Sequence, residues 1–409
     1  MPYAIVRVNL AAPLPALAAR EGERGVALDL RWRGRPVGFL LLPFGAARAF
    51  TPEELAPIVA LEAAARVVQA KLLEELAIPL PPPHELPRLT ITVCTKDRPA
   101  DVARWLEQVR RVRCAAGPLA ERVELLVVDN APSDDRTAEL VACMPDVRYA
   151  REPRPGLDFA RNRALREATG DFIAYIDDDA VVDAGWLDAF YEAWTENPDA
   201  GGITGQVLPY ELATEAQLLF EERGGFRRGF EKRRYHGARM REVPWYPHGA
   251  GNFGAGANMA FRRELLLSLG GFDEALDTGA PLPGGGDLDM FYRVARAGEP
   301  MVYEPAMLVF HQHRREYAGL RRQYWSWGAG FMAFVSKHFA REPAERRRWL
   351  LILEWWARYS LRMLARGAAR RGGMRVDLAA AELAGGIVGL CGTYGRSQRR
   401  SARIVAEHV

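Results

Sequence analysis

The sequence has little cysteine and no long apolar run. Its 409 residues contain four cysteines without paired spacing, which argues against a disulfide framework or a cysteine-based zinc site and favours a reducing compartment. No stretch approaches the roughly 20 apolar residues that a membrane-spanning helix needs. The first residues lack the basic start and apolar core of a signal peptide, so we expect none. These absences predict a cytoplasmic protein, with contact at the inner face of a membrane left open.

An excess of one charge is also missing. The chain has 55 Lys and Arg against 52 Asp and Glu, a net charge of +3. That balance is too small to indicate nucleic acid as a partner. Hydrophobic content of 49% and charged content of 26% are typical of a folded soluble protein. The length suggests two or three domains.

The sequence pattern of the first region, residues 1–86, predicts a small α+β domain. Strands are expected at residues 3–9, 26–32 and 37–42. A helix is expected at residues 52–76, with Thr51 as its N-cap and Pro52 at its first position. Five prolines between residues 79 and 87 then predict an extended linker. We find no motif of chemistry before this boundary.

The second region, residues 87–313, alternates predicted strands with predicted helices. The strands are expected at residues 89–94, 123–128, 147–150 and 172–176, and the helices at residues 101–112, 137–144 and 159–168. This alternation predicts a Rossmann-like α/β fold with a mostly parallel sheet flanked by helices. Ligands of such sheets bind beyond the carboxyl ends of the strands.

The third region, residues 314–409, is basic and predicted to be helical. Trp349, Trp355, Trp356 and Tyr359 stand among leucines, and arginines follow the last apolar segment. Aromatic and basic residues beside apolar helices can lie in a membrane interface. The alternative is an amphipathic helix that packs on the second region with its arginines in water.

Three consecutive acids, Asp177, Asp178 and Asp179, follow the strand predicted at residues 172–176. Side chains two apart on a strand point the same way, so Asp177 and Asp179 can face one ligand. Adjacent carboxylates repel unless a cation or donors offset their charge. The triplet therefore indicates a divalent-metal site, and the alternative is a polar turn.

The order of motifs resembles family 2 glycosyltransferases of the GT-A fold, over about residues 88–313. The matching segments are VCTKDRP at 93–99, LLVVDN at 125–130, ARN at 160–162, IDDD at 176–179, GAGANMAFR at 254–262, GGFD at 270–273 and GDLD at 286–289. Each motif is weak alone, but their order and spacing together are specific. The resemblance implies an inverting transfer of a sugar from a nucleotide-diphosphate donor to an acceptor hydroxyl. The acceptor would be a saccharide, a lipid-linked molecule or a small molecule.

The resemblance also implies which residues bind the donor. Thr95 and Asp97 would line the base pocket with Arg98 near it, and Asp129 would accept a hydrogen bond from base or ribose. Arg161 would approach the donor sugar or phosphate, or else be a solvated helix arginine.

Within the triplet, Asp177 would lie near the ribose and contribute to the metal site, and Asp179 would bind Mn²⁺ or Mg²⁺. Asp178 belongs to the same donor-binding segment but points elsewhere. A histidine is the expected third ligand. His311 and His313 both follow the last predicted strand, and only one of them is expected to face the site if the strand continues. His311 is favoured.

Asp287 is the candidate base that takes a proton from the acceptor hydroxyl. In the family this acid usually follows a glutamate, whereas Gly286 stands there in this chain. The alternative for Asp287 is the N-cap of a helix at residues 288–297. Asp289 would orient groups on the acceptor side, or compensate the helix dipole.

The remaining acceptor-side residues are predicted from residues 245–258 and from the aromatic residue after the triplet. Gly256 would line the acceptor pocket and Asn258 would lie near the donor sugar. Trp186 would stack on a sugar face, or else be a core residue.

Three other functions stay open at this point. A retaining transferase of similar fold is one, because of the missing glutamate. A nucleotidylyltransferase is another, although residues 95–99 lack the glycines of a triphosphate loop. The third is a non-catalytic scaffold that binds sugar nucleotides, against which the retained Asp177, Asp179 and Asp287 argue.

Overall fold

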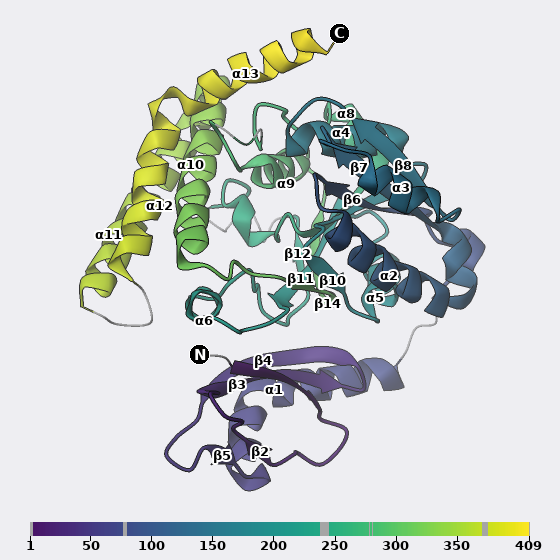
Figure 1. The fold of residues 1–409 in the computed structure, drawn as a ribbon, viewed down its shortest axis with the longest axis vertical. Coiled ribbons are helices and arrows are strands. Elements are labelled where there is room, and N and C mark those ends of the chain that lie inside the picture. The colour runs from purple at the N-terminus through teal and green to yellow at the C-terminus, as the bar shows by residue number, and fades with distance from the viewer. Residues whose placement is uncertain are drawn as a thin grey trace.

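The computed structural model describes residues 3–76, 80–237, 245–277, 279, 281–369 and 375–408. Its N-terminal unit is a three-stranded sheet, drawn in purple in Figure 1. Strand β3 (Gly25–Trp32) lies in the middle, parallel to β1 (Tyr3–Asn9) and antiparallel to β4 (Arg35–Pro43). Two short strands, β2 (Leu17–Ala18) and β5 (Ala49–Phe50), pair beside it.

Helix α1 (Pro52–Glu75) covers one face of this sheet and begins as predicted. The Thr51 hydroxyl accepts a hydrogen bond from the Glu54 amide at 3.3 Å, and the Glu54 carboxylate accepts one from the Thr51 amide at 2.8 Å. This reciprocal capping box satisfies two amides that would otherwise lack partners. The helix buries Leu55 and Val59 against the sheet.

The predicted proline linker lies partly outside the described residues, since these omit residues 77–79. Its later part forms a single 3-10 turn, Pro83–Glu85, before the second region begins.

The second region is built on one large sheet in the order β10-β14-β11-β13-β9-β6-β7-β8, with β12 paired to β14. Pairing is parallel from β8 to β9, and mixed from β13 onward. The strands are β6 (Leu89–Thr95), β7 (Val123–Asn130), β8 (Val147–Glu152), β9 (Phe172–Ile176), β10 (Ala180–Val182), β11 (Gly202–Pro209), β12 (Arg233–Tyr235), β13 (Asn258–Arg262) and β14 (Met301–His311).

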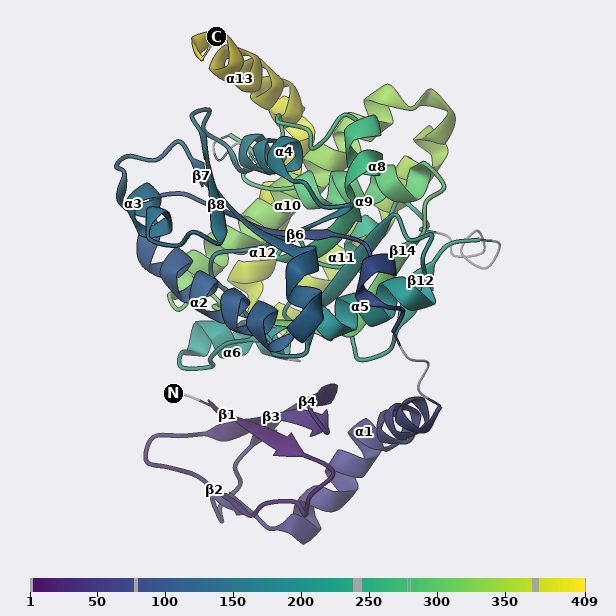
Figure 2. The same cartoon turned by 90° about the vertical axis from the view of Figure 1, so that its right-hand side faces the viewer.

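Helices cover both faces of this sheet (Figure 2). One face packs on α2 (Pro99–Ala115) and α5 (Trp186–Glu196), and the other on α4 (Leu157–Glu167) and α9 (Gly286–Arg296). The side chains of β7 show the alternation, because Val127 joins the first core and Val128 the second. Three short helices, α3 (Arg136–Ala142), α6 (Glu215–Glu222) and α8 (Arg263–Ser268), complete the region. The predicted α/β class with helices on both faces is confirmed.

The third region is helical, as predicted. Helices α10 (Tyr317–Arg341), α11 (Arg346–Ala368) and α12 (Val376–Val388) form a layer beside the large sheet, and α13 (Tyr394–Glu407) follows (Figure 1). Met332, Trp349 and Ile352 of this layer belong to the same buried core as the inward-facing residues of α9.

One segment of the described chain, Val376–Glu407, is long and apolar enough to span a membrane by length and composition, although the sequence analysis expected none. Its most apolar window has a mean hydropathy of 1.4 and is 33% buried in the protein. The segment is not one continuous helix, because Cys391 and Gly392 leave helical geometry between α12 and α13.

Candidate active site

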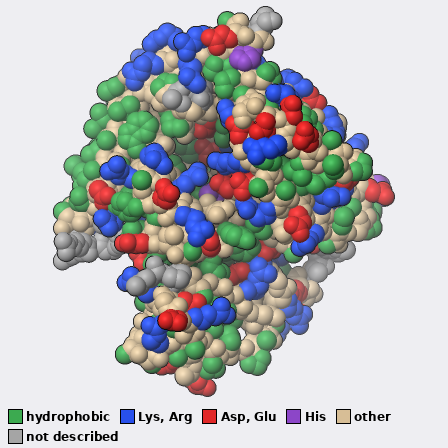
Figure 3. Space-filling view, viewed as in Figure 1, with side chains coloured by type: hydrophobic (Ala, Val, Ile, Leu, Met, Phe, Trp, Pro, Cys, Tyr) green, Lys and Arg blue, Asp and Glu red, His purple; other side chains and the backbone are tan. Residues whose placement is uncertain are grey.

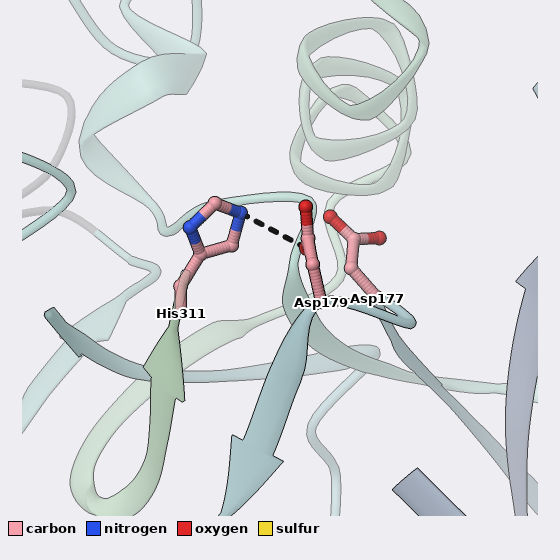
Figure 4. Close-up of side chains that lie close together, drawn as sticks. All are labelled: Asp177, Asp179 and His311. Atoms are coloured by element: carbon pink, nitrogen blue, oxygen red, sulfur yellow. Dashed lines mark ion pairs between the residues drawn. The ribbon is translucent and has the colours of Figure 1, made fainter. Parts of the chain in front are cut away.

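Three potential metal ligands converge where the strands of the large sheet end (Figure 4). Asp177 follows β9, Asp179 precedes β10, and His311 ends β14. Because β10 pairs with β14 so that Ala180 lies opposite His311, the turn and the histidine become neighbours. One ligand atom from each residue lies within 4.8 Å of the others.

The donor set of this cluster suits a hard divalent cation. Two carboxylates and one imidazole are ligands that Mn²⁺ and Mg²⁺ accept. Oδ1 of Asp179 lies 3.1 Å from Nε2 of His311, yet it is buried without a hydrogen bond to any described residue. A buried carboxylate oxygen with no hydrogen bond is costly unless a cation satisfies it. The residues present therefore fit a divalent metal.

The two acids of the cluster have pKa values shifted in opposite directions. Burial raises the pKa of Asp177 to about 6, and the neighbouring charge of Asp179 adds to this. Burial also raises the pKa of Asp179, but the facing His311 outweighs it and lowers that pKa to about 2. Burial alone would lower the pKa of His311, but the attraction of the Asp179 carboxylate is stronger, so the pKa of His311 is raised. His313 is not one of the three potential ligands: its Nε2 lies 2.8 Å from Glu221, and its Nδ1 lies 3.1 Å from Nδ1 of His311.

Asp178 fastens the triplet to the neighbouring strand end. The Thr95 hydroxyl donates to its Oδ2 at 2.7 Å, and Arg98 donates to its Oδ1 at 2.9 Å. Both carboxylate oxygens are thus engaged within the protein. These contacts make Thr95, Arg98 and Asp178 supports of the metal cluster, and their direct contact with a donor stays a prediction.

The end of β7 carries an acceptor that lacks a partner. Asp129 is fully buried, and the Tyr149 hydroxyl donates to its Oδ2 at 3.1 Å, while its Oδ1 has no hydrogen bond within the part of the chain that the structure describes. Burial raises the pKa of this carboxyl. Nearby, Asp97 accepts two hydrogen bonds from Ser133, whose amide and hydroxyl lower its pKa. Thr95 lies opposite Asp129 in the β6–β7 register, so the polar strand ends adjoin as predicted.

Arg161 is buried in an ion-pair cluster that the sequence analysis did not find. Its Nη1 lies 2.9 Å from Asp158 and 3.3 Å from Asp277. It is therefore not a solvated helix arginine. Burial opposes its charge, but the attraction of these acids outweighs burial and raises its pKa. The spacing of three residues from Asp158 was a signal for this pair on α4, whereas Asp277 lies in a loop without one.

Asp287 lies in the first turn of α9, and the prediction that it is the N-cap is wrong. The cap is Gly285, whose φ of 105° is left-handed, and the helix begins at Gly286. The Asp287 carboxylate accepts hydrogen bonds from the amide of Gly256 at 3.1 Å and from the amide of Leu288 at 2.8 Å. These two bonds fix where the carboxylate points.

The glycine before Asp287 is explained by its surroundings. A Cβ on Gly286 would come within 2.6 Å of Oδ2 of Asp277, and it would also overlap Asp158. The Gly286 amide donates to the same Asp277 oxygen at 2.9 Å. The acid that the family pattern places at this position has no room here, and two other carboxylates occupy its surroundings.

One cavity of about 880 Å³ joins these groups. Its acidic end contains Asp177, Asp179, Asp287 and His311 together with Arg161. Figure 3 shows acidic side chains deep in a hollow between the C-terminal helices and the sheet region. The opposite wall is aromatic and comes from α10 and α11: Trp327, Phe331, Trp355, Trp356 and Tyr359. The sequence analysis did not connect these aromatic residues with the site.

Comparison with known proteins gives a family for the sheet region. Residues 90–269 match the family model described as Glycosyl transferase family 2. This region is a family 2 glycosyltransferase domain. The predicted family is confirmed for this region, and relatives named as glycosyltransferases agree with the predicted enzyme class.

Its curated relatives are distant. A glucosyl-dolichyl phosphate glucuronosyltransferase of Haloferax volcanii is 27% identical over 193 residues, 46% of this chain and 56% of that protein. A pre-mycofactocin glycosyltransferase of Mycobacterium tuberculosis is 24% identical over 260 residues, 62% of this chain and 49% of that protein. The matches thus span about half the length of these relatives. A mannosyltransferase from Pyrobaculum calidifontis, solved with GDP-Man and Mn²⁺, superimposes with a TM-score of 0.43 at 19% identity, covering 85% of this chain and 86% of that one.

Three residues predicted beside the substrates are structural instead. Trp186 is fully buried, stacks on Phe190 and donates from Nε1 to Oδ1 of Asn258 at 2.9 Å. It cannot stack on a sugar. Asn258 is also fully buried, and its amide group donates to the carbonyl of Gln206 at 3.0 Å. The prediction that Asn258 lies near the donor sugar is wrong, because the polar atoms of its side chain are already hydrogen-bonded to buried partners.

Asp289 does not face the acceptor either. It is fully buried, 2.7 Å from Arg293 and 2.8 Å from His338, and it also pairs with Lys337. Burial raises its pKa, but the bond from His338 and the nearby cations outweigh burial and lower it. Asp289 therefore anchors α9 to α10. Among the predicted acceptor-side residues, Gly256 does line the cavity, beside Asp287.

Proposed function

We propose that this glycosyltransferase is inverting, and that it moves a sugar from a nucleotide-diphosphate donor to an acceptor hydroxyl by direct displacement. One observation carries the proposal. Asp177, Asp179 and His311, which suit a metal, and Asp287, which suits a base, line the same cavity. A base and a leaving-group site on opposite sides of one sugar are what single displacement needs.

Asp177, Asp179 and His311 hold a divalent cation, Mn²⁺ or Mg²⁺, in this proposal. When bound, the cation would offset the charge that develops on the departing nucleoside diphosphate. The role of Asp179 rests on its buried oxygen without a hydrogen bond. Arg161 lines the same end of the cavity and adds positive charge there.

Asp287 takes the proton of the acceptor hydroxyl as its oxygen attacks the anomeric carbon. The amides of Gly256 and Leu288 hold the carboxylate in one orientation, which leaves its remaining lone pairs for the hydroxyl. Fixed orientation of a base lowers the entropic cost of reaching the transition state. The retaining alternative predicts the opposite product configuration, and NMR of the product's anomeric proton separates the two.

Asp129 and Asp97 bind the nucleoside in this proposal. Oδ1 of Asp129 is a buried acceptor without a hydrogen bond, and an N–H or O–H of the base or ribose would satisfy it. Thr95, Arg98 and Asp178 contribute by holding the triplet against the end of β6.

The acceptor is lipid-linked in our proposal. The aromatic wall from α10 and α11 suits an apolar group, and Arg314 and Arg322 in the same cavity suit an anionic one. Leu350 and Leu361 of α11 are 54% and 64% exposed, so apolar surface also lies outside the cavity on this helix. A relative named for a dolichyl phosphate substrate supports the same class. Residues 314–409 would then work at the inner face of a membrane.

The proposal divides the chain into three functional parts. Residues 87–313 carry the metal site and the base, and residues 314–409 complete the acceptor side. None of the described residues between 3 and 86 lines the cavity.

The test is donor binding by thermal shift. A panel of nucleotide sugars with Mn²⁺ should contain one that raises the melting temperature of the wild type, because a ligand stabilises the state that binds it. EDTA should remove this shift, and so should Asp179→Ala. The control Asp135→Ala removes an acid whose side chain is 68% exposed and should change nothing. A donor shift that survives EDTA would contradict the metal site.

A further inference from the structure

Residues 1–86 pack against the back of the metal-binding turn. Tyr3, Ala27 and Phe39 of the N-terminal sheet form one buried apolar cluster with Leu208, Leu212 and Leu308 of the second region. The amide of Tyr3 also donates to the carbonyl of Leu212 at 2.9 Å. This contact explains why seven of the eight residues of β3 are buried, since α1 covers one face and the second region the other.

A buried ion pair crosses this contact. Nη2 of Arg31 lies 2.9 Å from Oδ2 of Asp183, and the two side chains are 3% and 6% exposed. Asp29 lies 2.9 Å from Nε of the same guanidinium and fixes it from its own sheet. The largely exposed Arg7 also lies 3.7 Å from Asp183 and 3.2 Å from Asp29. Loss of Arg31 would therefore leave two buried acids with Arg7 as their one cation among the described residues, so the Arg31 contact holds its partners firmly.

Asp183 is tied to the strand pair that carries two of the metal ligands. It directly follows β10, which begins one residue after Asp179. Its amide donates to the carbonyl of Leu308 in β14 at 3.0 Å, three residues before His311. The ion pair from Arg31 therefore reaches both strands whose ends hold Asp179 and His311.

The neighbouring residue in β14 gives a second, independent contact. Phe310 precedes His311, and successive side chains of a strand point to opposite faces. The Arg31 guanidinium lies 5.8 Å from the centre of the Phe310 ring, and that of Arg7 lies 5.9 Å from it. These distances are typical of cation–π contact. The N-terminal unit thus holds the face of β14 opposite to the one that presents His311.

We infer that residues 1–86 position the metal site, and that Arg31 is the positioning residue. The inference rests on the proposed metal site but adds a role for a domain without a motif of chemistry. Arg31 touches neither the ligands nor the cavity, so it acts through Asp183 and Phe310. It resembles the outer-sphere partners that orient metal ligands in other proteins.

The experiment compares Mn²⁺ affinity in full-length variants by calorimetry, without donor or acceptor. Arg31→Met should weaken Mn²⁺ binding about 10-fold, the usual effect of losing a residue that orients a ligand. Arg31→Lys keeps the charge and should recover part of the loss. The matched control is Arg35→Met, which removes an ion pair of the same contact, to Glu192 at 3.0 Å and to Glu304 at 3.5 Å. Glu304 lies seven positions before His311, so this variant should bind Mn²⁺ within about twofold of the wild type.

Two results would overturn the inference: folded Arg31→Met with wild-type Mn²⁺ affinity, or an equal loss in Arg35→Met. If Arg31→Met does not fold, Arg31→Met with Asp183→Leu replaces the pair by apolar groups, an exchange that buried pairs often tolerate. That double variant should fold and still bind Mn²⁺ more weakly, and wild-type affinity would overturn the inference equally. A wild type that binds no Mn²⁺ would instead refute the metal site, on which the inference depends.

Discussion

The amide of Gly256 donates to Oδ2 of Asp287 at 3.1 Å, so a strand-entry loop fixes the acid at the start of α9. The Leu288 amide fixes the other oxygen. An asparagine can keep one of these bonds but cannot take a proton. Asp287→Asn should therefore bind the donor normally and lose transfer by roughly 10²–10⁴-fold, the usual contribution of a general base.

Initial rates and donor titrations of the same preparation measure the two effects. The control Asp135→Asn changes an exposed acid and should match the wild type in both. Near-normal turnover of Asp287→Asn would mean that another group takes the proton.

Gly286→Ala should destabilise the protein by about 1–3 kcal/mol, because the added Cβ would crowd the Asp277 carboxylate in a filled space. Gly284→Ala is the control in the same loop, since its nearest neighbour would be the carbonyl oxygen of Ser326 at 3.7 Å. Chemical denaturation of both variants gives the comparison. Equal stability of the two variants would show that the loop shifts to make room for the added Cβ. The absence of the family's glutamate at position 286 would then need another explanation.

Without metal, the stability that Asp177 contributes should fall as the pH rises from about 4 to about 6. The folded-state pKa is raised to about 6 from an ordinary 3.8, so the folded protein favours the protonated acid and loses this preference on ionisation. The unfolding free energy of the wild type relative to Asp177→Asn should drop by up to roughly 3 kcal/mol over that range. Added Mn²⁺ should reverse the drop at pH 7, since the metal binds the ionised carboxylate.

Denaturation at several pH values, with and without EDTA, checks this. Asp179, whose pKa is lowered to about 2, behaves oppositely: its contribution is lost only as the pH falls below about 4. A difference between wild type and Asp177→Asn that stays constant with pH would contradict the environment described for Asp177.

Trp355→Ala should raise the KM for a lipid-linked acceptor about tenfold, which corresponds to ~1.4 kcal/mol of lost contact. The Trp355 side chain lines the cavity and is 42% exposed. Leu361→Ala is the control on the same helix, because Leu361 is 64% exposed and lies outside the cavity wall. Affinity for the donor should not change in either variant. An unchanged acceptor KM in Trp355→Ala would remove this wall from the acceptor site.

The order of the elements and the place of the acidic triplet could be predicted from short-range patterns, whereas His311 was expected only from the family resemblance. Apolar runs of strand length, each followed by acids, marked β7 and β9, and the capping box marked the start of α1. The partners of the two histidines distinguish them in the structure, because His311 faces Asp179 whereas His313 pairs with Glu221.

The roles of Trp186, Asn258 and Asp289 could not be predicted, because each depends on a partner distant in sequence. Asn258 meets Trp186 across 72 positions, and Asp289 meets His338 across 49. A polar residue in a motif looks the same in sequence whether it faces a ligand or a buried partner. The aromatic wall was missed for a similar reason, since the path of α11 past the cavity is fixed by core packing.

Asp289 also bears on how this protein can be shortened or recombined. Its charge is offset by Lys337 and His338 of α10, while Asp287, two residues earlier, stands at the cavity. A chain ending at His313 would lose both of these partners and leave Arg293 as the one cation paired with Asp289 among the described residues. Residues 314–409 therefore cannot be exchanged freely for the corresponding region of another protein. Chimeras that replace them must carry matching cations at positions 337 and 338.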